Sequence, residues 1–113
     1  MKPLRPRVLV IDPDPSICAL LAAVVRRRGF EADTAGCREE ALQRARVRAY
    51  AAITLEPRMA GGDALLRELP RRNLIVATTA TDVTPKGVAA VLRKPFLIDE
   101  LSSLIDGYWP ASA

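Results

Sequence analysis

The chain has 113 residues and a mass of 12.3 kDa, the size of one ordinary domain, so we expect a single domain over residues 1–113. Half of its residues are hydrophobic and 27% are charged, which is typical of a globular protein and excludes a wholly disordered chain. It contains no histidine. This excludes Ser-His-Asp and Cys-His catalysis, histidine metal ligands and phosphotransfer through a histidine of this chain.

The balance of charge is basic, with 17 lysines and arginines against 13 acidic residues, a net charge of +4 and a pI of about 9.6. Most arginines fall where helices are expected to end, and there they complement the helix dipole without an external partner. The few aromatic residues do not interleave with them as a stacking platform would. We therefore expect a solvated basic surface, and nucleic acid is not expected as a partner.

The two cysteines and the lengths of the apolar runs indicate the cellular compartment of the protein. Cys18 and Cys37 show neither CxxC spacing nor a disulfide framework, which predicts core thiols in a reducing compartment. The apolar run 8–11 is too short for a signal peptide, and the longest run, 17–25, is too short to cross a bilayer. We expect a cytoplasmic protein that has no membrane partner.

Strand-like apolar runs alternate with helical periodicities along the chain, without an internal repeat. Asp14 as N-cap and Pro15 as first helical residue predict the start of a helix that Gly29 ends. The pattern predicts strands over 8–11, 31–35, 51–55, 74–78 and 88–92, and helices over 15–28, 38–48, 63–69 and 98–106. Buried strands joined by helices predict an α/β fold with a parallel, doubly wound sheet.

Polar residues stand where four of these strands end. They are Asp12 and Asp14 after the first strand, Glu56 after the third, Thr78 and Thr79 at the fourth, and Lys94 after the fifth. Ligands of doubly wound sheets bind at the carboxyl ends of the strands, so we expect these side chains at one edge. A single loop aspartate is usually a cap and a single lysine is usually solvated, but their joint placement indicates a site.

Several segments, taken together in the order in which they occur, resemble the receiver domain of bacterial two-component response regulators. The resemblance extends over nearly the whole chain. The segments are Val-Leu-Val-Ile-Asp12-Pro-Asp14-Pro, Arg-Gly29-Phe-Glu-Ala-Asp-Thr-Ala, Glu40-Ala-Leu, Glu56-Pro-Arg-Met59-Ala-Gly61-Gly-Asp-Ala-Leu-Leu, Thr79-Ala, and Lys94-Pro95-Phe96 before Asp99-Glu100-Leu101. The resemblance implies a flavodoxin-like (CheY-like) fold with a five-stranded parallel sheet in the order 2-1-3-4-5.

The resemblance also implies a site. In that family an aspartate after the third strand accepts a phosphoryl group from a histidine kinase, two acidic residues after the first strand help to hold Mg²⁺, and a Thr or Ser and a Lys contact the phosphoryl group. By position these roles fall on Glu56 as phosphoacceptor position, on Asp12 with Asp14 as acidic pocket, and on Thr79 and Lys94. The resemblance further implies a cis peptide bond before Pro95 and an ion pair from Lys94 to Glu56 or Asp12.

Three residues depart from the family pattern. Glu56 is one methylene longer than the aspartate and is not expected to accept a phosphoryl group, and Pro13 stands where the second acidic residue belongs. A metal would be limited to Asp12, Glu56 and backbone oxygens, so we expect no resident cofactor and only weak Mg²⁺ binding. Val91 replaces the aromatic switch residue and is too small to act as one.

The interval from Thr79 to Lys94 is shorter than in the family by about two helical turns. Residues 82–86 include Pro85 and offer little to build a helix, so we expect the fourth helix to be shortened or missing. Two means would protect the uncovered sheet flank: a loop laid across it, or association with a second molecule. We expect association, through Leu74, Val76, Val88 or neighbouring side chains.

Two functions from different classes are compatible with these residues. The favoured one is a pseudo-receiver, a phosphorylation-independent signalling module that is not an enzyme and binds a signalling protein or a second copy of itself. The alternative is a haloacid-dehalogenase-like Mg²⁺-dependent phosphatase, with Asp12 as nucleophile and Asp14 as acid/base. It needs Asp99 and Glu100 at a strand end, whereas both fall in the first turn of a predicted helix, where acidic residues favour the dipole. A nucleic-acid-binding accessory is a third, weaker possibility.

Overall fold

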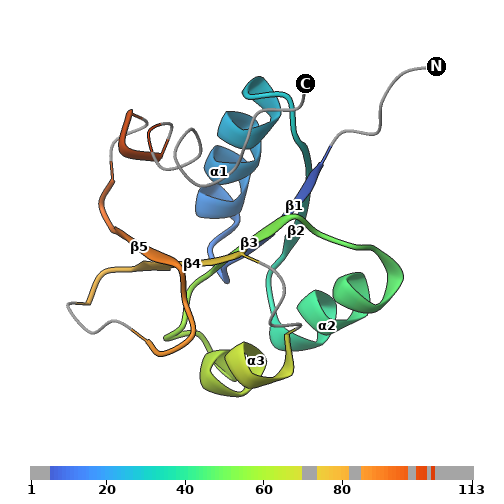
Figure 1. Ribbon diagram of the computed structural model, residues 1–113. Helices are drawn as coiled ribbons and strands as arrows, with labels where there is room; N and C mark the ends of the chain where they lie inside the picture. Colours follow the sequence, from blue (N-terminus) through green and yellow to red (C-terminus); the bar gives the residue numbers. More distant parts are fainter. Residues whose placement is uncertain (1–5, 70–73, 82–84, 97–98, 102, 104–113) are drawn as a thin grey trace.

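A computed structural model describes residues 6–69, 74–81, 85–96, 99–101 and 103 (Figure 1). In chain order the elements are β1 (Arg7–Ile11), α1 (Pro15–Arg27), β2 (Glu31–Ala35), α2 (Arg38–Val47), β3 (Ala52–Leu55), α3 (Gly62–Glu68), β4 (Leu74–Thr79) and β5 (Ala90–Arg93). Strands and helices alternate as predicted, and most boundaries lie within a residue or two of the expected positions.

The five strands form one parallel sheet in the order β2-β1-β3-β4-β5, which confirms the predicted topology. α1 covers one face of the sheet, and α2 and α3 cover the other (Figure 1). Because all strands are parallel, their carboxyl ends meet at a single edge. This arrangement brings the loops after β1, β3 and β5 together.

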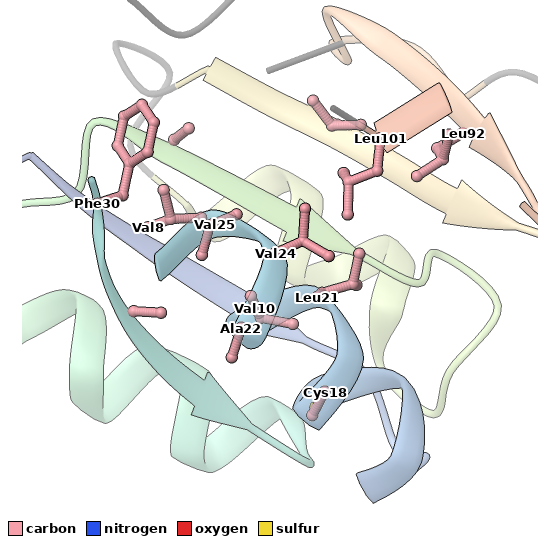
Figure 2. Packing of buried hydrophobic residues seen from close by; sticks show 13 residues of the cluster. Val8, Val10, Cys18, Leu21, Ala22, Val24, Val25, Phe30, Leu92 and Leu101 are labelled. Carbon is pink, nitrogen blue, oxygen red and sulfur yellow. The ribbon is translucent and has the colours of Figure 1, made fainter. Parts of the chain in front are cut away.

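Each face of the sheet has its own hydrophobic core. Alternate residues of β1 point to opposite faces, so Val8 and Val10 pack against α1 while Leu9 and Ile11 pack against α2 and α3. Figure 2 shows the α1 side, where Leu101 joins the cluster although it lies far along the chain. Residues 99–101 and 103 are helical and Leu101 is fully buried, as the predicted last helix requires; the rest of 98–106 lies outside the described residues.

The ends of α1 follow the signals in its sequence. The Asp14 carboxylate accepts a hydrogen bond from the Ser16 N–H at 2.9 Å, and Pro15 is the first helical residue. Gly29 has a φ of 92°, in the left-handed region that glycine adopts without steric cost, and the helix ends there. Both predictions are confirmed, and none of the described helices is long and apolar enough to span a membrane.

The segment before β5 differs from the prediction. The strand was expected from Val88, but Gly87 takes a φ of 88° in a turn, and the strand ladder begins only where Ala90 lies opposite Val76. Between β4 and β5 none of the described residues is helical; residues 82–84 lie outside the description. The expected association through Val76 is wrong, because this side chain faces α1 and is fully buried; the Leu74 side chain is not among those described.

The two cysteines differ in their surroundings. Both are free, but only Cys18 is a core thiol, and its Sγ lies 3.2 Å from the backbone oxygen of Asp12. Burial raises the pKa of the Cys18 thiol, and the neighbouring Asp12 carboxylate adds to this effect. Cys37 is exposed at the start of α2, so the expectation of a second core thiol is wrong.

The α1 side of the sheet also contains a hydroxyl that lacks a partner. Thr54 is fully buried between Val10 and Val76, and its Oγ1 has no hydrogen-bond partner among the described residues. We expect Thr54→Val to raise the free energy of unfolding by about 1 kcal/mol, because the shape is kept and a buried unpaired polar group is removed. Urea denaturation measures this change.

The control for this prediction is Thr54→Ala, which removes the hydroxyl and also leaves a small cavity. We expect it to be less stable than the valine variant. A loss of stability in Thr54→Val would show that the hydroxyl has a partner and would contradict the prediction.

Candidate functional site

Three charged side chains meet at the carboxyl edge of the sheet, each from a different loop. The Lys94 ammonium, just after β5, lies 2.6 Å from Asp12 Oδ2, after β1, and 3.2 Å from Glu56 Oε1, after β3. The expected ion pair is therefore confirmed, and Lys94 makes it with both carboxylates at once. The peptide bond between Lys94 and Pro95 is cis, as expected.

Both oxygens of Asp12 are occupied by donors of this chain. Oδ1 accepts a hydrogen bond from the Asp14 N–H at 2.8 Å, and Oδ2 accepts one from Lys94. The residue is only 1% exposed. A buried carboxylate requires such compensation, because an unpaired charge is costly to remove from water.

Glu56 is satisfied in the same way. Its Oε1 accepts a hydrogen bond from Lys94, and its Oε2 accepts one from the Arg58 N–H at 3.1 Å. The Glu56 side chain is 14% exposed, so the pair lies close to the surface. Each of the four carboxylate oxygens of Asp12 and Glu56 thus has a protein donor.

The charge of Lys94 is strengthened by these neighbours. Burial by itself lowers the pKa of the ammonium, but hydrogen bonds and charges from Asp12 and then Glu56 outweigh burial and raise the pKa above its usual value. Lys94 therefore holds its proton more firmly in the folded protein than in the unfolded chain.

Other predicted site residues lie outside this ion cluster. The Asp14 side chain is exposed and caps α1, so its carboxylate does not join Asp12. Thr79 is fully buried, and its Oγ1 accepts a hydrogen bond from the Thr81 N–H at 3.3 Å rather than contacting the cluster. Val91 is half-buried on β5, opposite Ala77.

As arranged, the residues do not fit a divalent cation. The two predicted metal ligands, Asp12 and Glu56, share an ammonium at the place where a cation would neutralise them. Pro13 adds no side-chain oxygen, and among the described residues no three His, Cys, Asp or Glu side chains form a metal-binding group. A metal held by these oxygens would lie beside the positive charge of Lys94.

Two partners of the site were missed by reasoning from the sequence. The Arg58 N–H binds Glu56 and Thr81 binds Thr79, and neither was singled out. A backbone N–H is offered by any residue except proline, so the residue type at 58 gives no signal. The turn after Glu56, marked by proline and glycines, was the one available indication.

Comparison with known proteins agrees with this fold. No protein-family model matches the chain. The transcriptional regulatory protein ZraR of Escherichia coli O157:H7 is 29% identical over 111 residues, which cover 88% of this chain and 25% of that protein. The chain thus spans about a quarter of the length of this relative.

Solved structures are similar over almost the whole chain. The response regulator TrrA of Thermotoga maritima, in complex with Mg²⁺ and BeF, is 28% identical with a TM-score of 0.79, covering 91% of this chain and 98% of that one. The chemotaxis protein CheY4 of Vibrio cholerae is 21% identical with a TM-score of 0.81, covering 93% and 99%, and this match concerns the fold alone.

The parallel sheet in the order 2-1-3-4-5, with charged loops at its carboxyl edge, defines a CheY-like flavodoxin fold. In sequence the chain is similar to the transcriptional regulatory protein ZraR, at 29% identity, and to the response regulator TrrA, at 28% identity.

The ion cluster predicts a stability effect. We expect Lys94→Met to lower the free energy of unfolding by about 3 kcal/mol at neutral pH, because two neighbouring, largely buried carboxylates lose their cation. Lys86→Met is the control, since it removes an exposed lysine with the same change of charge. Thermal and urea denaturation measure both variants, and equal effects would contradict the prediction.

The stability difference between the wild type and Lys94→Met is also expected to depend on pH. A raised pKa in the folded state means that the Lys94 contribution is complete below the unfolded pKa of about 10.4 and is lost as the pH rises through the folded pKa. The stability difference between wild type and Lys94→Met should therefore shrink above about pH 10.4. A difference that grew with pH would contradict this assignment.

Proposed function

We propose that the chain is a pseudo-receiver: a signalling module that keeps the receiver fold, is not a phosphoryl acceptor or an enzyme, and works by binding another protein. One observation carries the proposal. The Lys94 ammonium binds Asp12 and Glu56 together, and backbone N–H groups take the remaining oxygens of both. Each of the four oxygens therefore has one donor supplied by the chain itself.

The residue types support the same conclusion. Glu56 extends the acceptor carboxylate by one methylene, and Pro13 offers no ligand beside Asp12. The structure of TrrA holds Mg²⁺ and BeF, and we infer that this chain binds Mg²⁺ at most weakly. The Lys94 ammonium supplies part of the positive charge that a metal cation would bring to Asp12 and Glu56.

Glu56 gives the site a permanent charge. A carboxylate carries one negative charge and two acceptor oxygens, whereas a phosphoryl group carries about two charges and three oxygens. The ion cluster therefore holds one arrangement of the loops after β1, β3 and β5 by an interaction that needs no kinase. The partner we propose is a signalling protein or a second copy of the chain.

The phosphatase alternative is less well supported. It requires Asp14 to act beside Asp12 as acid/base, but the Asp14 carboxylate caps α1 through Ser16. Asp99 and Glu100 are exposed in a helical turn, where acidic residues favour the helix dipole. We therefore do not propose an enzyme.

Phosphoryl donors test the proposal directly. We expect acetyl phosphate with millimolar Mg²⁺ to leave the chain at its unmodified mass, because Glu56 is held by Lys94 and Arg58. Intact-mass spectrometry measures this, and Mg²⁺ alone should not raise Tm through binding linkage. A gain of one phosphoryl group mapped to Asp12 or Glu56 would overturn the proposal.

The positive control restores the family residues in the same chain. The double variant Pro13→Asp with Glu56→Asp replaces the proline by an acidic side chain and shortens the acceptor by one methylene. We expect this variant, unlike the wild type, to gain one phosphoryl group and to be stabilised by Mg²⁺. Its response shows that the donor and the assay are competent.

A further inference from the structure

A furrow lies between α3 and the segment that precedes β5. One cavity, of about 540 Å³, is bordered by Leu66 and Arg67 of α3, Ile75 of β4 and Lys86. A second, of about 660 Å³, shares Asp63, Arg67 and Pro85 with the first and extends to Arg58. The shared residues make the two cavities adjoining parts of one depression, which we call the α3 furrow.

The floor of the α3 furrow is apolar. Ile75 is 4% exposed, and Leu66 is half-buried against the same core. No described residue between β4 and β5 is helical, so no helix from this part of the structure covers the floor. Apolar side chains are thus reachable from the surface at a place where they could pack against a partner.

The rim is positively charged. Arg58, Arg67 and Lys86 are exposed, and none of their side chains has a hydrogen-bond or ion-pair partner among the described residues. Among the described residues that line the furrow, Asp63 is the one acidic residue against these three cationic ones. The lining therefore has an excess of two positive charges. These cations are available to an anionic partner.

We propose that the α3 furrow binds an amphipathic α-helix of a partner protein, with a leucine-rich stripe on the floor and glutamate or aspartate side chains at the cationic rim. This inference specifies the partner in the proposed function and depends on the chain working by protein binding. An apolar stripe flanked by acidic residues matches an apolar floor between cations.

Other occupants fit the furrow less well. A peptide strand would need an open strand edge, but β4 is already paired with β3 and β5. Nucleic acid has phosphates for the rim but no apolar stripe for Leu66 and Ile75. A second copy carries the same net charge of +4, which opposes association.

The test is a titration followed by fluorescence anisotropy. The probe is a fluorescein-labelled peptide of about 16 residues with leucine at helical i, i+3, i+4 and i+7 positions and glutamate and alanine elsewhere. We expect saturable binding of this peptide to the whole chain. A peptide with lysine in place of every glutamate should not bind.

Variants locate the binding. Arg67→Glu with Lys86→Glu should weaken binding of the acidic peptide about tenfold or more, since like charges then face each other. The control is Arg27→Glu with Arg46→Glu, which makes the same change of charge at exposed residues outside the furrow, and affinity should stay within about twofold. Circular dichroism melting shows that both variants fold.

Three results would overturn the inference. They are failure of the acidic peptide to bind, equal weakening by both charge-reversal pairs, and a dimer in sedimentation that Arg67→Glu with Lys86→Glu dissociates. A fourth is direct binding of duplex DNA to the wild type that is tighter than binding of the peptide and is lost in Arg67→Glu with Lys86→Glu, which would assign the furrow to nucleic acid. If the chain binds the peptide and also accepts a phosphoryl group, the proposed function is contradicted but this inference is not.

Discussion

The contact of Lys94 with Asp12 and Glu56 is the interaction on which the functional edge depends. It links the ends of three strands that are distant in the chain, β1, β3 and β5. Two carboxylates this close to one lysine, one of them almost completely buried, would repel each other without the cation between them. The geometry of all three loops is therefore coupled to a single ammonium group, whose proton affinity the same contacts raise.

Much of this edge could be predicted from the sequence, because it follows from topology. Parallel strands place their carboxyl ends together, so Asp12, Glu56 and Lys94 were expected at one edge once the strands were recognised. The N-cap of α1 at Asp14 and the end of this helix at Gly29 depend on local sequence alone, so they too could be predicted. Whether Asp14 would share the site with Asp12 or cap the helix depended on side-chain direction, which spacing alone does not determine.

The errors have physical reasons too. The start of β5 was placed early because Val88 and Ala89 are as apolar as the strand itself, whereas the positive φ of Gly87 delays the pairing. Val76 was assigned to an open flank, but neighbouring residues of a strand point to opposite faces, so Val76 faces α1 while Ile75 faces the other side. The partner of Glu56 was missed because a backbone donor has no signature in residue type.

The loop from 57 to 61 connects the ion cluster to the α3 furrow. Its Arg58 N–H binds Glu56, while the Arg58 side chain lines the furrow. The loop also packs tightly at the start of α3: a Cβ at Gly62 would lie 2.3 Å from the Pro57 carbonyl oxygen, so only glycine fits there without displacement of the backbone. Glu56 and the furrow are thus adjacent through a short, closely packed segment.

The strand order also determines when the chain can complete its fold. β1 can pair with β2 as soon as residue 35 is available, and β3 adds next to β1, which brings Asp12 and Glu56 together. Lys94 follows β5, the last of the described strands and one of the two at the edges of the sheet. A partly folded chain without β5 therefore has two carboxylates and no cation, and docking of the last strand supplies the charge that the earlier strands lack.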